Sequence, residues 1–191
     1  MVTDQSVKKD KRECILQAAA SLFMKEGYFK VTMDMVAEKA GVAKGTLYLY
    51  FKNKDELFAC VIQSRVQKVI NDAVRVVDAS RSLDELIENL FLITDRIVKE
   101  MGVYKGTGER FMELPVGVRK KIKKRIPERV KAFNTYIGKM VKGFVPGVGM
   151  EPEYIGEVIL TLTIRSSILG EKGFKEAVKR FIKTGLEKEE K

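Results

Sequence analysis

The stretch from Thr32 to Phe51 constrains this chain most, because its apolar residues fit two short helices joined by a sharp turn. Thr32 can cap the first helix, and Gly41 lies where a left-handed residue would end it. In the second helix Val42, Leu47 and Phe51 would face the core. The apolar positions of the first helix recur at i, i+3, i+4 and i+7, and are Met33, Val36, Ala37 and Ala40. This pattern predicts a helix-turn-helix.

The second helix would also carry an outward face that solubility alone does not explain. That face comprises Lys44, Gly45, Thr46, Tyr48 and Tyr50. In a helix that enters the major groove, a Lys can reach guanine edges, a Thr can meet a phosphate or a thymine methyl, and Tyr hydroxyls can reach phosphates. Gly45 costs the helix about 0.5–1 kcal/mol relative to Ala, which a close approach to DNA would explain. Because Tyr48 and Tyr50 cannot face the same way, one of them can instead be a half-buried core residue.

From about Lys11 to Leu57 the chain resembles the DNA-binding domain of the tetracycline-repressor (TetR) family of transcriptional regulators. The resemblance is carried by Ile15 to Phe23, Gly27-Tyr28, Thr32 to Ala40, Gly41-Val42, Gly45 to Tyr48 and Tyr50 to Leu57. It implies DNA contacts at Thr32, Ala43, Lys44, Gly45, Thr46, Tyr48, Leu49, Tyr50 and Lys54. Ala43 departs from the family pattern, since many relatives have a polar cap there. Asn53, followed by Glu56, is interpreted as a helix cap rather than a base contact.

Charge is distributed unevenly along the chain. The net charge of +10 favours a polyanionic partner without specifying a fold. Six of the seven residues 119–125 are basic. A solvated helix face is the simplest interpretation of this run, and phosphate contact or an acidic ligand are the alternatives. A second basic cluster, which an arm along the DNA backbone would explain, consists of Lys8, Lys9, Lys11 and Arg12.

The chain as a whole predicts an all-α fold of nine or ten helices, because helix signals recur and no strand alternation bounded by turns appears. We expect a three-helix helix-turn-helix DNA-binding domain over 1–53 and a larger ligand-binding and dimerisation domain over 54–191. The later helices are expected at Asp55 to about Val77, Leu83 to Met101, from near Pro127, Pro152 to Gly170, and Phe174 to Leu186. The loops are expected at 78–82, 102–108, 115–118 and 143–151.

The last two predicted helices indicate a homodimer. The helix over 153–170 has apolar residues on two sides and therefore needs two partners, while the final helix has one broad stripe. Two such hairpins would pack as a four-helix interface, as the resemblance also implies; the alternative satisfies both stripes within one chain. The expected interface residues are Ile155, Val158, Ile159, Leu162, Ser166, Leu169, Phe174, Val178, Phe181 and Ile182. Such a dimer would bind two half-sites of a near-palindromic operator in double-stranded DNA.

The middle of the chain, from about Leu83 to Pro152, is expected to enclose a small-molecule effector site. Its aromatic and thioether side chains suit an apolar pocket, although taken singly each has core packing as its simpler role. They are Phe91, Met101, Tyr104, Phe111, Met112, Phe133, Tyr136 and Met140. By resemblance, effector binding would change the separation of the recognition helices and release DNA, so that effector and DNA disfavour each other reciprocally. Such a protein is most simply a repressor.

Other classes of function have less support. The chain has no His for acid–base chemistry and no Cys/His metal cluster, and residues 102–108 lack the Gly-Lys-Ser/Thr order of a phosphate loop, so no enzyme, metal or cofactor is expected. A sequence-neutral DNA-binding protein is the main alternative. No apolar run approaches the roughly 18–20 residues that span a membrane. Residues 15–23 form a helical stripe rather than a signal peptide, so we expect a cytoplasmic protein without a membrane partner, with Cys14 and Cys60 as thiols.

The composition further predicts a heat-stable protein. The chain has no His and no Trp, and Lys and Glu are abundant while Asn and Gln are few. That balance is typical of hyperthermophile proteins. We therefore expect a melting midpoint above about 60 °C, at the upper end of the usual mesophilic range or beyond it.

Overall fold

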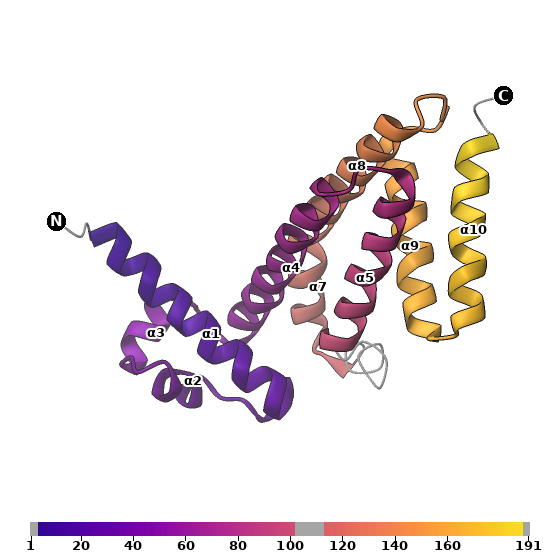
Figure 1. Cartoon of the computed structure of the whole chain (residues 1–191). Coiled ribbons are helices and arrows are strands. Elements are labelled where there is room, and N and C mark those ends of the chain that lie inside the picture. The colour runs from indigo at the N-terminus through magenta and orange to yellow at the C-terminus, as the bar shows by residue number, and fades with distance from the viewer. Residues whose placement is uncertain (1–3, 102–112, 189–191) are drawn as a thin grey trace. The chain divides into compact units, whose positions relative to one another are not determined.

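In the computed structural model, which describes residues 4–101 and 113–188, all regular secondary structure is helical (Figure 1). The helices are α1 (Asp4–Lys30), α2 (Met33–Lys39), α3 (Lys44–Tyr50), α4 (Lys54–Asp78), α5 (Leu83–Met101), α7 (Val116–Arg125), α8 (Pro127–Phe144), α9 (Pro152–Leu169) and α10 (Lys172–Lys188). The all-α prediction is confirmed. The number of helices depends on how two places are counted, because α1 runs through a non-helical Gly27 and 102–112 lie outside the described residues. No helix in the described part of the chain is long and apolar enough to cross a bilayer.

The chain divides into two compact units whose boundary differs from the predicted one between residues 53 and 54. The first unit comprises Met1–Val66 and Met112–Ile126, and the second comprises Gln67–Phe111 and Pro127–Lys191. Helix α4 is continuous, so the division falls inside it rather than at its start. The predicted loop at 115–118 is also wrong, since Pro115 is the N-cap of α7, which begins at Val116. Helix α7 therefore belongs to the same unit as the helix-turn-helix.

Two helices begin with side-chain caps, and the one at α4 is the cap predicted at Asn53. At the start of α4, the Glu56 amide donates to Asn53 Oδ1 (2.9 Å) and the Lys52 amide donates to Glu56 Oε2 (3.1 Å). At the start of α5, the Glu85 amide donates to Ser82 Oγ (3.2 Å). These bonds satisfy amides that the first turn of a helix leaves unpaired. The beginnings of α4 and α5 are thus fixed by local sequence.

The first unit has an apolar core to which each of its helices contributes. Helix α1 supplies Ile15 and Phe23, and Phe23 meets Phe58 of α4 edge to face, with ring centroids 4.8 Å apart. The other fully or nearly buried side chains include Val36, Leu47, Phe51, Leu57, Val61, Val118 and Ile122. Because Val118 and Ile122 lie one turn apart on α7, the inner face of that helix is part of this core.

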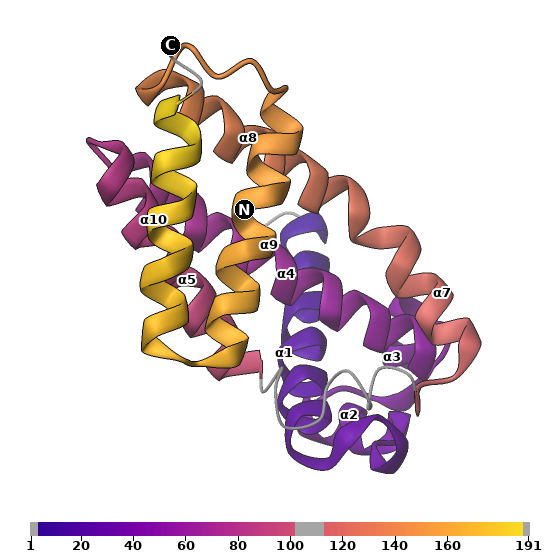
Figure 2. The ribbon, with the colours of Figure 1, turned by 90° about the vertical axis from the view of Figure 1, so that its right-hand side faces the viewer.

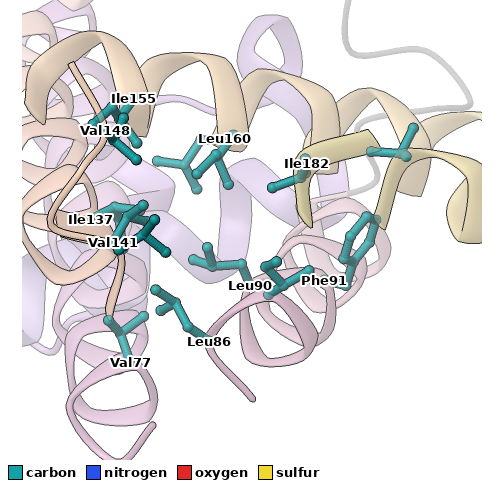
Figure 3. Close-up of a cluster of buried hydrophobic side chains, with 14 residues drawn as sticks. Val77, Leu86, Leu90, Phe91, Ile137, Val141, Val148, Ile155, Leu160 and Ile182 are labelled. Atoms are coloured by element: carbon teal, nitrogen blue, oxygen red, sulfur yellow. The ribbon is translucent and has the colours of Figure 1, made fainter. Parts of the chain in front are cut away.

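The second unit is built around α9, which packs against α5, α8 and α10. Figure 3 shows side chains from α4, α5, α8, α9 and α10 pointing toward one another. Leu86, Leu90 and Phe91 contribute from α5, and all three are fully buried. The cluster also contains Val77, Ile87, Ile137, Val141, Val145, Val148, Ile155, Ile159, Leu160, Val178 and Ile182.

Helices α8 and α9 cross with their backbones in contact. A Cβ atom at Gly138 would lie 1.7 Å from the Pro152 carbonyl oxygen, and one at Gly156 would lie 1.8 Å from the Asn134 carbonyl oxygen. The two contacts are reciprocal. Gly138 of α8 meets Pro152, which lies one turn before Gly156, and Gly156 of α9 meets Asn134, which lies one turn before Gly138. Figure 2 shows the two helices running side by side. This crossing therefore requires that both positions lack a side chain.

Helix α10 is joined to α5 by ion pairs rather than by apolar contact alone. Lys175 Nζ lies 2.5 Å from Asp95 Oδ2, Lys179 Nζ lies 2.5 Å from Glu88 Oε1, and Lys183 Nζ lies 2.8 Å from Asp84 Oδ1. The ammonium groups of Lys175 and Lys179 also lie 5.1 Å and 5.5 Å from the centroid of the Phe91 ring. One face of α10 is thereby turned to its own chain.

Candidate nucleic-acid interface and effector groove

Helices α2 and α3 form the predicted helix-turn-helix. Thr32 Oγ1 accepts a hydrogen bond from the Met35 amide (3.2 Å), which caps α2. Gly41 has a φ of 65°, a left-handed conformation that favours glycine. The Val42 amide donates back to the Ala37 carbonyl (3.0 Å), so the turn is closed by its own backbone. The predicted cap, turn and second helix are all confirmed.

Helix α3 presents an exposed face with few polar side chains. Ala43 is its N-cap and makes no side-chain hydrogen bond, as the sequence predicts. Leu49 is 85% exposed and Tyr48 is 43% exposed, whereas Thr46 and Tyr50 are half-buried. Among the residues that the structure describes, nothing lies within 4 Å of a Cβ placed on Gly45, so packing against them does not require a glycine there. A partner outside the described chain that approaches this backbone closely would explain it.

Lys44, the basic residue of this face, forms an ion pair with α2. Its Nζ lies 2.7 Å from Oδ1 of Asp34, and both side chains are exposed. The hydrogen bond from Lys44 to Asp34, together with the charge of Asp34, raises the pKa of the lysine. The lysine is therefore paired across the helix-turn-helix while its side chain remains exposed to solvent. The sequence placed Asp34 at the start of α2 but did not indicate this pair.

Lys54, at the start of α4, is also held by neighbouring groups. Its Nζ lies 4.5 Å from the centroid of the Tyr28 ring and donates to the Phe29 carbonyl (3.4 Å). The Tyr28 hydroxyl in turn donates to Asp55. Burial, the hydrogen bond to Asp55 and the charge of Asp55 raise the pKa of Tyr28 well above its usual value. Gly27, with a φ of 80°, turns the end of α1 toward this group.

Helix α7 lies along the first turns of α4 and contributes two of its basic side chains to that contact (Figure 2). Lys121 Nζ lies 3.8 Å from Asp55 Oδ2, and Arg125 Nη2 lies 3.8 Å from Glu56 Oε1. Arg125 Nη1 also donates to Cys60 Sγ (2.7 Å). The basic run 119–125 is thus not only a solvated face, because part of it holds α7 on α4. The sequence did not predict this contact, because α7 and the start of α4 are far apart along the chain.

The N-terminal basic cluster does not form a separate arm in the structure. Helix α1 begins at Asp4, so the cluster lies within a helix. Arg12 places its guanidinium carbon 5.3 Å from the centroid of the Phe51 ring, where it covers the core of the first unit. A contact between these residues and the DNA backbone stays a prediction. Helix α1 begins before Ile15, the first apolar residue of its periodic stripe.

A groove in the second unit lies between the later part of α4 and the first turns of α8. It has a volume of about 290 Å³, is open to solvent, and is lined by Gln67, Ile70, Val74, Arg129, Ala132, Phe133 and Tyr136. The Tyr136 hydroxyl donates to Asp78, and burial together with Asp78 raises the pKa of Tyr136 to about 12. Arg129 makes no ion pair with any residue that the structure describes. An apolar surface with one cation suits an amphipathic molecule.

The predicted effector residues have different positions in the structure. Phe133 and Tyr136 line the groove. Phe91 is fully buried in the core and does not line this groove, and Met140 packs against that core. The Met101 side chain and the whole of Tyr104, Phe111 and Met112 lie outside the described residues. The α4 wall was missed because Ile70 and Val74 follow the same helical period as core residues.

The predicted interface residues are divided between the core and the surface. Ile155, Ile159, Ser166, Val178 and Ile182 are buried in the second unit itself and cannot also line an interface in this conformation. Leu162 is half-buried. The exposed apolar side chains of α9 and α10 are Tyr154, Val158, Ile164, Leu169, Phe174 and Phe181. We call these six residues the α9–α10 apolar surface. The sequence predicted four of them but could not tell which stripe faced the chain's own core.

Comparison with known proteins places the helix-turn-helix among regulators. Residues 15–61 match the family described as "Bacterial regulatory proteins, tetR family". The chain is 37% identical over 87 residues to the "Uncharacterized HTH-type transcriptional regulator YhgD" of Bacillus subtilis, covering 45% of this chain and 46% of that protein. It is 30% identical over 143 residues to the regulator YfiR of the same organism, covering 69% of this chain and 66% of that protein. The matches thus span about half to two thirds of these relatives.

Solved structures extend the likeness to the whole fold. FadR from Bacillus subtilis, described as a transcriptional regulator in complex with stearoyl-CoA, superposes with a TM-score of 0.63. The superposition covers 89% of this chain and 96% of FadR, at 17% sequence identity. At that identity the likeness concerns the arrangement of the helices and not the ligand.

Proposed function

This chain belongs to the TetR family of bacterial regulatory proteins, and from that membership we propose that it is a homodimeric, ligand-responsive repressor of transcription. It acts in the cytoplasm, where it binds a near-palindromic operator, and a small, largely apolar molecule releases it. The single observation that carries the proposal is the exposed face of α3 on a closed helix-turn-helix, where Gly45 is required by nothing within the described chain. The proposal includes no enzymatic activity.

The α9–α10 apolar surface supports the dimer. Six large apolar side chains are exposed on these two helices, and Phe181 alone is 67% exposed. Large apolar side chains that are exposed on two neighbouring helices are typical of an interaction site. A twofold dimer makes such a surface self-complementary and brings two copies of α3 to one face of a duplex. The interface proposed here is therefore smaller than the sequence predicts, and consists of exposed residues only.

The groove between α4 and α8 supports an amphipathic effector. Ile70, Val74 and Phe133 offer an apolar surface, and Arg129 offers a cation at the same groove. Stearoyl-CoA, the molecule bound by FadR, combines an apolar chain with anionic groups and is a suitable first probe. The groove volume of about 290 Å³ is at the small end of ligand sites, so such a chain would fill or widen it.

Both walls of the groove are continuous with the helix-turn-helix unit. The wall on α4 extends without a break to Lys54, and α8 follows α7 after Ile126. Lys121 and Arg125 of α7 pair with Asp55 and Glu56 in the first turn of α4. An effector that separates α4 from α8 would therefore act on the start of α4 in two ways. It would act directly through α4, and indirectly through α7, which precedes α8 and pairs with the first turn of α4. Such a ligand shifts the population toward the conformation that binds DNA less tightly.

The proposal is tested on the DNA upstream of the chain's own coding region. The full-length protein should protect a near-palindrome there in a footprint, and stearoyl-CoA should abolish that protection. The variant Ala132→Phe fills the groove, so it should protect the same site without responding to stearoyl-CoA. Protection of all DNA without a preferred site would instead support a sequence-neutral DNA-binding protein. Because the chain has no Trp, effector binding is followed by calorimetry.

The ion pair on the recognition face yields a further prediction. Asp34→Asn removes the carboxylate that holds Lys44, so the lysine becomes available to DNA and the local repulsion of phosphate falls. We expect tighter DNA binding and a slope of log K against log salt that steepens by about 1 per recognition helix. The measurement is fluorescence anisotropy of a labelled duplex over a salt series.

Asp10→Asn is the matched control, because it removes one exposed carboxylate from the same unit, away from Lys44. It changes the net charge equally. If Asp10→Asn and Asp34→Asn tighten binding by the same factor, the effect belongs to overall charge and the role given to the pair is wrong.

A further inference from the structure

Positive charge is concentrated in the unit that holds the helix-turn-helix. The first unit has 17 Lys and Arg against 9 Asp and Glu, which accounts for +8 of the chain's net charge of +10. Helix α7 alone contributes six basic residues and no acid. Because α7 comes from the middle of the sequence, this charge is added to the DNA-binding unit by tertiary packing.

The basic residues of α7 have two different environments. Lys121 and Arg125 face α4, in line with the buried Val118 and Ile122. On the other side Lys120, Lys123 and Lys124 are exposed, and none of the three forms an ion pair with a described residue. They are spaced at i, i+3 and i+4 and therefore form one patch on the helix surface. We call these three residues the α7 lysine patch.

The position of the patch points to one kind of partner. Like charges at this spacing destabilise a helix, and the nearby acids Asp55 and Glu56 are already paired with Lys121 and Arg125. The α7 helix also adjoins the start of α4, since Lys121 Nζ lies 3.5 Å from Oδ1 of Asn53. The patch adds three exposed ammonium groups to a unit whose net charge is already positive, and such a unit is suited to a polyanion.

We propose that the α7 lysine patch is a second DNA-contact surface, which binds phosphates of the same duplex that the helix-turn-helix holds. This rests on the proposed DNA-binding function and adds a contact outside the helix-turn-helix. Lysines on phosphates carry no base preference, so the patch adds affinity and salt dependence without changing the sequence that is recognised. The proposal thus assigns phosphate contact to part of the basic run 119–125, for which the sequence left several interpretations open.

The test removes the patch as a unit with Lys120→Gln, Lys123→Gln and Lys124→Gln in one full-length variant. Binding to a labelled 40-base-pair duplex of random sequence is measured by anisotropy between about 50 and 300 mM KCl. Each lost phosphate contact lowers the slope of log K against log salt by about 0.9, so a patch variant that loses three contacts in each subunit should lose about 5 per dimer. At about 100 mM salt we expect at least a tenfold loss of affinity.

The matched control carries Lys68→Gln, Lys139→Gln and Lys172→Gln. These three lysines are exposed and lie in the second unit, so the control removes the same charge. Its slope should change by less than about 1. Equal slopes for the two variants, or a patch variant that binds as the wild type does, would overturn the proposal. So would unchanged DNA binding combined with lost binding to phosphatidylglycerol vesicles, which would identify a membrane surface as the partner.

The two proposals fail in different ways. If the wild-type protein binds no duplex at any salt concentration, the DNA-binding function itself is wrong. If the wild type binds and the patch variant keeps the full salt slope, only the second contact surface is wrong. Melting curves of both triple variants should match the wild type, because all six side chains are exposed.

Discussion

Phe181→Glu should convert the protein to a monomer and weaken its binding to operator DNA by about 10²–10⁴-fold, because a dimer makes the second half-site contact intramolecular. Phe181 is 67% exposed and belongs to the α9–α10 apolar surface. A buried, unpaired carboxylate in the middle of an interface carries a large desolvation cost. Analytical ultracentrifugation at micromolar concentration measures the first effect, and anisotropy with the operator duplex measures the second.

Leu92→Glu is the control for this prediction. Leu92 lies on α5 and is 62% exposed, so the substitution places the same charge at a comparably exposed apolar position that is not part of the α9–α10 apolar surface. It should leave the dimer and its operator affinity unchanged. A Phe181→Glu protein that sediments as a dimer would show that the α9–α10 apolar surface is not the interface, and a monomeric wild type would remove the dimer from the proposal.

Gly156→Ala should destabilise the chain by about 3 kcal/mol or more, which lowers the melting midpoint of a chain of this length by roughly 10 °C. The new methyl group would lie 1.8 Å from the Asn134 carbonyl oxygen. Neither backbone can move without disturbing the contact that Gly138 makes with Pro152 on the other side of the crossing. Thermal unfolding followed by circular dichroism measures the shift.

Gly143→Ala provides the comparison, because Gly143 lies on α8 and a Cβ there meets nothing within 4 Å. Replacing an unconstrained helical glycine by alanine stabilises a helix by about 0.5–1 kcal/mol. The two substitutions should therefore shift the melting midpoint in opposite directions. Equal small shifts would mean that α8 and α9 separate at little cost.

The local structure of the helix-turn-helix could be predicted because its determinants are neighbours in sequence. Thr32 caps α2 three residues ahead of the amide that it accepts from, and Gly41 supplies the positive φ of the turn. The absence of a side-chain cap at Ala43 could be foreseen in the same way. Helix periods likewise predicted most element boundaries, since apolar stripes and caps act within a few residues.

Contacts between distant residues could not be predicted in this way. An apolar stripe shows that one face of a helix is buried but not what covers it, so half of the expected interface residues are in the chain's own core. The pairing of Arg125 with Glu56, and that of Lys44 with Asp34, depend on which helices become neighbours. The sequence contains Gly138 and Gly156, but only the crossing of α8 and α9 gives them their role.

The ion pairs between α5 and α10 give the proposed dimer surface a particular response to heat. The cost of removing charged groups from water falls as temperature rises, whereas apolar burial gains little more. The pairs of Lys175, Lys179 and Lys183 therefore attach α10 to its own chain relatively better in a hot solution than in a cold one. Because the opposite side of α10 carries Phe174 and Phe181, heating would leave this aromatic side correctly oriented while looser parts of the chain begin to open. In the proposed dimer, the subunit contact would thereby be protected by charges that take no part in it.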